Sequence, residues 1–368
     1  MNILMLLGYF RTSSYNGAVG GGEMSNIDLA TKLVELGNNV TTITLFSNLE
    51  NESYYKGVKV YKIKSVSESI PFKVLGWLNY KKTTDSIMSN QKYDVIICGP
   101  DTVELASELS LKYRIKAGCF VRAYENFDNY SSKKIKNKIK LKLKRLLFGD
   151  NSLKTLKEMD FILTNSKYMK LFCRNQNLTQ KIKVIYPALS FKYIVPVENK
   201  VIKNITMVGT GIHKGNFIAE ELANIYPEIN FNILGCPENL RKRNDLINLN
   251  YIDWCDVINF FTENTDVVIV PSEWEEPFGR VAIEGLACGN ITLVSNRGGL
   301  PETVANINEL IVMSNNIHAW NEKIDDVINN QLKYVNLSNK AQKLLHEYSP
   351  ERQAIKLQDF LRLKTNIF

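Results

Sequence analysis

The chain has 368 residues, of which 45% are hydrophobic, so it is long enough for two domains of ordinary size. Its formal net charge is +8, but eight basic residues within 133–145 supply the whole excess, and basic and acidic residues elsewhere are equal in number. This distribution argues against a nucleic-acid-binding protein with a broad basic surface. The eight residues are Lys133, Lys134, Lys136, Lys138, Lys140, Lys142, Lys144 and Arg145.

The cysteines are scattered and form no CxxC or other metal-ligand spacing, which predicts reduced, mostly buried thiols and a cytoplasmic location. No basic region precedes the apolar start of the chain, so no signal peptide is expected, and no stretch approaches the roughly 20 apolar residues of a membrane span. The cysteines are Cys98, Cys119, Cys173, Cys236, Cys255 and Cys288.

Short apolar runs alternate with helical patterns, which is typical of parallel α/β sheets covered by helices on both faces. Helices are expected at Asn26–Leu36, Phe217–Ile225, Arg280–Ala287 and Pro350 to about Thr365. Strands are expected at Ile3–Leu7, Val40–Thr44, Val95–Cys98, Gly118–Val121, Phe161–Thr164, Val184–Tyr186, Ile205–Val208, Phe231–Leu234, Val267–Val270 and Ile291–Val294.

A glycine-rich loop, 17–23, follows the first strand and precedes a helix that is expected to start near Met24. Gly20, Gly21 and Gly22 would let the backbone approach a ligand, and the helix N-terminus would favour a phosphate. The spacing fits the dinucleotide fingerprint poorly, so an ordinary flexible turn remains an equal alternative.

Two lysine-flanked stretches could touch a membrane surface. Residues 132–148 are interpreted as a basic amphipathic helix that either lies on anionic lipid or packs on the N-terminal domain by its Ile/Leu face. A strand is the weaker interpretation, because strands are poor in lysine. Residues 72–82, with Trp77 and Tyr80, more plausibly pack.

The series of strands restarts after about residue 200, and the irregular stretch 190–202 carries Pro196. We therefore predict an N-terminal Rossmann-like domain at 1–189, a linker at 190–202, a second Rossmann-like domain at 203–347 and a C-terminal helix in 348–368 that crosses back to the first domain. In such sheets, ligands bind at the carboxyl ends of the strands.

In the second half, the loop 209–215 follows a predicted strand and carries Thr210 and Lys214. A lysine in a loop that opens a helix is a natural partner for a diphosphate, although most lysines are simply solvated.

Residues 271–289, PSEWEEPFGRVAIEGLACG, follow another predicted strand. Glu276 lies in a loop, and a helix that begins near Phe278–Gly279 carries Glu284 about two turns further on. The amides near Phe278, Gly279 and Arg280 suit a phosphate, and a partly buried Glu284 could accept hydrogen bonds from vicinal sugar hydroxyls. The structural alternatives are a helix-start acid for Glu276 and a salt bridge for Glu284.

A metal site is not expected near this loop. Its carboxylates include no Asp-x-Asp pair, and the histidines, His213, His318 and His346, are not part of it.

With the segment 267–304 in view, including NRGGLPE at 296–302 and the Glu-x7-Glu spacing, the chain resembles glycosyltransferase family 4, the group 1 transferases. The resemblance covers nearly the whole chain. It implies the GT-B fold, with two Rossmann-like domains facing a central cleft, and a retaining, metal-independent transferase without a cofactor.

By position, the resemblance implies that Glu284 binds the ribose hydroxyls of a nucleotide-sugar donor, Glu276 holds the donor sugar and Lys214 neutralises the diphosphate. Gly21 and the amides around Phe278–Gly279 would contact donor phosphate or sugar.

Two features depart from the family pattern. Thr210 stands where the family usually has an arginine, so Arg280, Arg297 or His213 would have to compensate. The N-terminal half has no histidine, and Arg122, Tyr124 or Glu125 could line the acceptor side instead.

The expected function is therefore sugar transfer from a nucleotide sugar to a hydroxyl of a glycan, possible acceptors being lipid-linked or cell-surface polysaccharide precursors. The alternatives are a catalytically silent donor-binding or scaffold protein and a GT-B epimerase. Nucleic acid is not an expected partner, whereas the inner face of a membrane is a possible one.

Overall fold

The computed structural model describes residues 1–12, 20–49, 52–63, 70–127, 143, 145–147, 152–191, 194–238 and 245–365. These residues form two compact units, each built around its own sheet. Unit 1 comprises Met1–Leu189 and Tyr348–Phe368, and unit 2 comprises Ser190–Glu347.

Unit 1 contains an eight-stranded sheet in the order β3-β4-β2-β1-β5-β6-β7-β8. All neighbouring pairs are parallel except β3 and β4. The strands are β1 (Asn2–Phe10), β2 (Asn39–Ser47), β3 (Ser53–Tyr55), β4 (Val58–Lys62), β5 (Val95–Cys98), β6 (Lys116–Val121), β7 (Phe161–Thr164) and β8 (Lys181–Val184).

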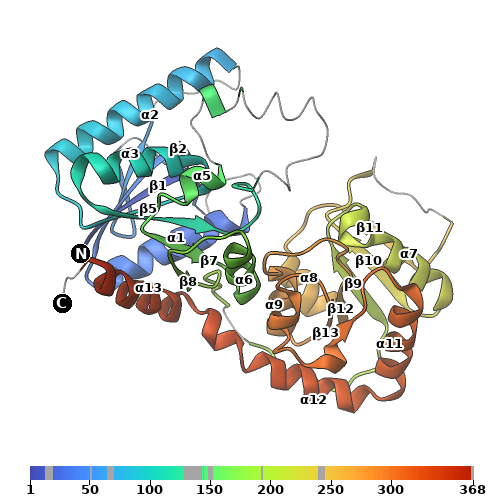
Figure 1. Ribbon diagram of the computed structural model, residues 1–368. Helices are drawn as coiled ribbons and strands as arrows, with labels where there is room; N and C mark the ends of the chain where they lie inside the picture. Colours follow the sequence, from blue (N-terminus) through green and yellow to red (C-terminus); the bar gives the residue numbers. More distant parts are fainter. Residues whose placement is uncertain are drawn as a thin grey trace. The chain divides into compact units, whose positions relative to one another are not determined.

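Helices cover both faces of this sheet, with α1 and α13 packed against each other on one face and α2 and α3 on the other (Figure 1). The central strands are buried on both sides, which explains their continuous apolar sequences. The helices are α1 (Gly21–Glu35), α2 (Ile70–Asn90), α3 (Val103–Tyr113), α5 (Leu153–Leu156), α6 (Lys167–Asn175) and α13 (Pro350–Thr365), with a 3-10 turn, η1 (Pro100–Thr102).

The C-terminal helix α13 is part of the core of unit 1. Phe360 packs edge-on against Phe161 with ring centroids 5.4 Å apart, and Lys32 of α1 pairs with Glu351 at 2.7 Å. The Gln353 side chain accepts a hydrogen bond of 2.8 Å from the Tyr186 amide. The helix therefore fixes the backbone around Tyr186, near the end of the first chain segment of unit 1, Met1–Leu189.

Unit 2 contains a fully parallel six-stranded sheet in the order β11-β10-β9-β12-β13-β14. Its strands are β9 (Asn204–Val208), β10 (Asn230–Leu234), β11 (Leu249–Ile252), β12 (Val267–Val270), β13 (Ile291–Ser295) and β14 (Ile311–Val312).

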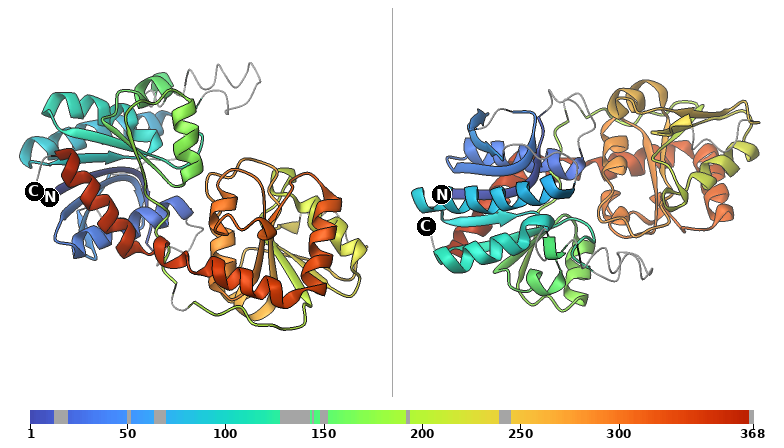
Figure 2. Two further views of the ribbon diagram at one scale, coloured as in Figure 1. Left: turned by 60° about the horizontal axis from the view of Figure 1, so that its bottom comes forward. Right: turned by 90° about the horizontal axis from the view of Figure 1, so that it is seen from above.

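In unit 2, α8 and α9 lie on one face of the sheet, and α7 and α11 lie on the other (Figures 1 and 2). The helices are α7 (Asn216–Ile225), α8 (Val257–Asn264), α9 (Arg280–Ala287), α10 (Leu300–Thr303), α11 (Ile317–Asn329) and α12 (Gln331–Gln342). The 3-10 turns are η3 (Ile212–Lys214), η5 (Asn308–Leu310) and η6 (Leu345–Tyr348), the last of which runs into unit 1.

Many predicted strands and helices begin or end at other residues than the observed elements, and two of these differences change the interpretation of a segment. The strand expected at Val184–Tyr186 is β8, which ends at Val184, because only Lys181–Val184 pair with β7. The apolar Ile185 and Tyr186 are buried by packing beyond the strand, and Tyr186 meets Tyr348 edge-on. The first helix starts at Gly21 rather than near Met24, so two of the glycines belong to its first turn.

The structure describes most of one lysine-flanked stretch, 72–82, but only a few residues of the other, 132–148. Most of 132–148 lies outside the described residues, and its described members, Leu143 and 145–147, are helical. In α2, Trp77 and Tyr80 are buried, as the packing interpretation requires. No helix in the described part of the chain has both the length and the apolar character needed to cross a membrane.

Candidate functional site

The carboxyl ends of β9 and β12 bring two predicted site residues together. These strands are parallel neighbours, so the loops that follow them meet at one edge of the sheet. Lys214 lies in the first loop and Glu276 in the second. The Lys214 ammonium nitrogen lies 2.5 Å from Oε1 of Glu276, which makes the two an ion pair.

Glu276 is held by more than this ion pair. Its side chain is nearly buried, and the Ser272 hydroxyl donates to the same Oε1 at 2.9 Å. The Ser295 hydroxyl in turn donates to the Ser272 carbonyl at 2.7 Å, which fastens the loop to β13. The described donors thus both reach one carboxylate oxygen, and the carboxylate is oriented before any ligand arrives.

Close backbone packing at this site requires two glycines. A Cβ on Gly215 would lie 2.1 Å from the Pro271 carbonyl oxygen, and a Cβ on Gly298 would lie 2.1 Å from the Glu276 carbonyl oxygen. Both residues also have positive φ angles, of +80° and +58°. The Gly299 amide donates to the Glu276 carbonyl at 2.7 Å. In the sequence, the glycines that follow Lys214 and Arg297 were the signal from which this close packing could have been predicted.

The helix α9 begins beside Glu276 and carries Glu284. None of the described side chains caps its N-terminus, where Gly279 has a φ of +109° and Phe278 is buried. Gly285 lets the helix pack closely on the sheet, because a Cβ there would lie 2.9 Å from Val268. This packing also fixes the position of Glu284, the residue before Gly285. The Glu284 side chain is 15% exposed.

Arg280 forms the structural salt bridge that the sequence left open for Glu284, with 3.1 Å between Nη2 and Oε1. Arg297 pairs with Glu275 at 3.2 Å, and the Gly298 amide donates to the same carboxylate at 2.7 Å. Two of the three side chains considered as substitutes for an arginine at position 210 are therefore engaged with carboxylates.

The third substitute, His213, is exposed, and its ring meets Trp274 edge-on at 6.4 Å. Lys214 lies over the same indole, with its nitrogen 5.4 Å from the ring centroid. Thr210 is half-buried, and the loop turns at Gly209, where φ is +99° and the Lys214 side chain lies across the backbone. Lys214 is thus the cation that the short loop directs toward Glu276.

In unit 1, Gly20 caps α1 and Gly21 and Gly22 form its first turn, whereas Gly17 lies outside the described residues. Glu23, in the same turn, makes a largely buried ion pair with Arg11 at 2.7 Å and accepts the Arg11 amide at 2.6 Å. This carboxylate fixes the end of β1 relative to α1.

The residues expected on the acceptor side follow β6. Arg122 donates to the Gly22 carbonyl at 2.6 Å and stacks over the Phe120 ring, so it joins the start of α1 to β6. Tyr124 points inward, where it packs edge-on against Phe172. Glu125 is exposed.

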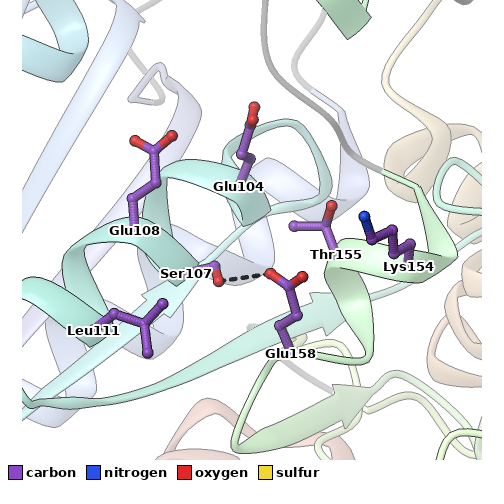
Figure 3. Close-up of a pocket in the computed structure, with 7 residues that line it drawn as sticks. All are labelled: Glu104, Ser107, Glu108, Leu111, Lys154, Thr155 and Glu158. Atoms are coloured by element: carbon purple, nitrogen blue, oxygen red, sulfur yellow. Dashed lines mark hydrogen bonds between the residues drawn. The ribbon is translucent and has the colours of Figure 1, made fainter.

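A separate pocket of about 270 Å³ lies in unit 1, between α3 and α5 (Figure 3). The Ser107 hydroxyl donates to Glu158 at 2.9 Å in this pocket. It presents three carboxylates and one lysine, so it would repel a diphosphate. Its lining residues are Glu104, Ser107, Glu108, Leu111, Lys154, Thr155 and Glu158. Among the described residues, no group of three or more His, Cys, Asp or Glu side chains is arranged to hold a metal ion.

The segment that carries this site matches a known family. Residues 225–344 match the family described as glycosyl transferases group 1. The chain therefore contains a glycosyltransferase group 1 domain over this segment. An uncharacterized glycosyltransferase of Haemophilus influenzae is 23% identical over 352 residues, covering 91% of this chain and 94% of that protein. An uncharacterized 42.6 kDa protein in the cps region of Klebsiella pneumoniae is 23% identical, covering 82% of this chain and 87% of its own length.

Solved structures confirm that this glycosyltransferase has the GT-B fold. Sucrose-phosphate synthase of Thermosynechococcus elongatus superposes with a TM-score of 0.74 at 15% identity, and each chain is covered completely. Anabaena HepE, solved in complex with UDP and glucose, gives a TM-score of 0.67 at 16% identity over 99% of this chain and 100% of that one. The enzyme class and the fold expected from the sequence are thus confirmed.

Proposed function

We propose that this glycosyltransferase moves a sugar from a nucleotide-sugar donor to a hydroxyl of a glycan, with retention of anomeric configuration and without a metal ion. The observation that carries the proposal is the convergence of Lys214, Glu276 and the start of α9 at one edge of the unit 2 sheet. HepE, which shares the fold, was solved with UDP and glucose, and this supports a nucleotide-sugar donor.

The charges of the site match the donor. A diphosphate would accept hydrogen bonds from the Lys214 ammonium and from the amides of Phe278, Gly279 and Arg280 at the positive end of the α9 dipole. Glu276 would accept a hydrogen bond from a sugar hydroxyl, and Glu284 would do so from the ribose hydroxyls. We assign Gly20, Gly21 and Gly22 to the donor as well, and Thr210 to the loop that approaches it.

In the proposed step, the acceptor oxygen attacks the anomeric carbon on the face from which the diphosphate leaves. The bond between that carbon and the diphosphate oxygen breaks, and the leaving oxygen takes the proton of the acceptor hydroxyl. Lys214 and the α9 amides stabilise the negative charge that develops on the diphosphate. This scheme needs no nucleophile from the enzyme.

The acceptor is proposed to be a glycan. The similarity to a protein encoded in a cps region supports a role in polysaccharide biosynthesis. Arg122, Tyr124 and Glu125 are the proposed acceptor-side residues, and Arg122 is the best placed of them because its guanidinium lies at the start of α1. Association with an anionic membrane surface through residues 132–148 is part of the same proposal.

A two-stage experiment tests the donor. A thermal-shift screen against UDP, GDP, ADP and their sugars would identify the nucleotide, because a ligand that binds the folded state raises Tm. The best nucleotide sugar is then incubated with the enzyme, and released nucleoside diphosphate is measured with and without a chelator. Stabilisation followed by chelator-resistant release is the expected result. No stabilisation by any nucleotide would overturn the proposal, and binding without release would favour a scaffold.

A further inference from the structure

Trp254 is exposed at the edge of the unit 2 sheet that is formed by the carboxyl ends of its strands. It follows β11 by two residues, and 72% of its surface is accessible. Trp77 and Trp320 are buried, which is the usual state of so large an apolar ring. An exposed indole offers a large apolar surface that a ligand would cover.

The backbone supports this indole from one side. A Cβ built on Gly235 would lie 3.1 Å from both Cη2 and Cζ2 of Trp254, so the six-membered ring rests against the glycine. Gly235 and Trp254 follow the neighbouring strands β10 and β11, and the Cys236 amide donates to the Ile252 carbonyl at 3.0 Å. The indole of Trp254 is therefore held against the backbone on one side, and the rest of its surface is open to solvent.

The indole lies close to the proposed donor site along the same edge. The Gly209 amide, in the loop that carries Lys214, donates to the Leu234 carbonyl at the end of β10 at 2.9 Å. Two strand spacings, about 10 Å, separate the ends of β11 and β9. If the diphosphate of a nucleotide lies at Lys214, its base would extend either toward the end of β11, where Trp254 lies, or along α9.

The helix α8 connects Trp254 with Glu284. It begins at Val257, three residues after Trp254, and packs against α9. The Cys288 thiol donates to the Ile258 carbonyl at 3.6 Å, and the Cys288 amide donates to the Glu284 carbonyl at 3.1 Å. Glu284 and the start of α8 are thus joined through Cys288, the residue that caps the C-terminus of α9.

We propose that Trp254 is the platform on which the base of the donor nucleotide stacks, beside a ribose held by Glu284. This inference rests on the proposed function, because it takes the nucleotide from there. Stacking uses the ring faces, which all bases share, and leaves the hydrogen-bonding edges unread. Trp254 therefore contributes affinity for the nucleoside, and it does so alike for every base that the site admits.

Calorimetric titration of the full-length protein with UDP, ADP, GDP and inorganic pyrophosphate tests this platform. Trp254→Ala is expected to weaken each nucleoside diphosphate that binds the wild type roughly ten- to a hundredfold, and to leave pyrophosphate unchanged. Trp254→Phe keeps a stacking ring and should retain most of the affinity. Tyr54→Ala removes a similarly exposed aromatic from unit 1 and should change neither affinity.

The outcomes separate this inference from the proposed function. Wild-type affinity of Trp254→Ala for the nucleotides would overturn the platform and leave the donor proposal standing. An equal loss of nucleotide and pyrophosphate affinity would show a structural role and overturn it as well. A wild-type protein that binds no nucleoside diphosphate would refute the proposed function itself, and the platform with it.

Discussion

The Lys214 ammonium lies 2.5 Å from the Glu276 carboxylate, although 62 positions separate the two residues in the chain. The contact exists because β9 and β12 are parallel neighbours and their following loops turn toward each other at Gly215 and Pro271. Each charge offsets the other when no ligand is bound. A diphosphate would bring Lys214 a second anion, and a sugar hydroxyl would bring Glu276 a further donor.

Replacing either member of this pair should sharply reduce turnover. Glu276→Ala and Lys214→Ala are each expected to lower kcat/KM for the nucleotide sugar at least about a hundredfold, which is the scale of losing transition-state contacts. The measurement is release of nucleoside diphosphate under initial-rate conditions. Because the two side chains touch, the double variant should lose less than the product of the two single losses.

Thermal unfolding of the same variants provides the control. Lys214→Ala leaves a nearly buried carboxylate without its cation, so part of its effect could be on stability. Lys323→Ala, at a partly buried lysine of α11 that contacts Tyr334, should lower stability without lowering kcat/KM at a temperature where it is folded. Turnover near the wild-type rate in both Glu276→Ala and Lys214→Ala would refute their assignment.

Glu284→Ala should remove the enzyme's preference for ribose over deoxyribose. If Glu284 accepts hydrogen bonds from the ribose hydroxyls, the wild type binds a ribonucleoside diphosphate more tightly than its 2′-deoxy form. The variant should bind both with similar, weakened affinity, and its turnover should fall at least about a hundredfold. Competition binding with the paired nucleotides measures the preference.

Arg280→Ala serves as the control for Glu284, because it removes the salt-bridge partner and leaves the carboxylate in place. Under the proposed role, the ribose preference survives in Arg280→Ala, even where diphosphate affinity falls. A wild type that does not distinguish the two sugars would rule out the ribose role.

Periodicity and motif spacing predicted the strands that form both sheet centres, because those strands are buried on both faces and have continuous apolar sequences. Strands β3, β4, β11 and β14, which lie at or next to a sheet edge, were not predicted, since they are short or mixed in sequence and their pairing is not visible in the sequence. The early start of α1 was missed because glycines indicate loops, whereas the capping by Gly20 depends on the local backbone.

At the site, the sequence singled out Lys214, Glu276 and Glu284 one by one. It could not show that Lys214 pairs with Glu276, because the pairing depends on which strands are neighbours. It also left Trp254 unnoticed, because no strand was predicted before it and the sequence alone does not show whether a tryptophan side chain is exposed. Only the exposure of this ring and its contact with Gly235 reveal it.

Gly298→Ala should damage the site through the backbone. A Cβ there would lie 2.1 Å from the Glu276 carbonyl oxygen and 2.6 Å from its amide nitrogen, and neither atom can rotate away. We expect a loss of stability of at least about 1–3 kcal/mol together with a fall in turnover, because Glu276 must shift. Gly8→Ala, where a Cβ meets nothing within 4 Å, is the matched control. Unchanged stability and turnover in Gly298→Ala would mean that the two loops can separate without consequence.

Cys255 should be the thiol that alkylating reagents modify in the folded protein. It is exposed, whereas the other five cysteines are buried. Partial desolvation of the sulfur atom and the neighbouring Asp256 carboxylate raise the pKa of Cys255 above its ordinary value. Since the thiolate is the reactive form, alkylation at pH 7 should be slower than that of a free thiol and should accelerate as the pH rises through and beyond about 9.

Asp256→Asn isolates the electrostatic part of this effect. Asp256 also caps α8 by accepting the Ile258 and Asn259 amides, and asparagine preserves that capping. Removing the negative charge lowers the pKa of Cys255, so Asp256→Asn should be alkylated faster than the wild type at pH 7–8, with the difference vanishing once both thiols are ionised. Mass spectrometry after timed alkylation measures the rates, and Cys255→Ser should abolish the modification. Equal rates in the two proteins at every pH would show that burial alone sets the pKa of this thiol.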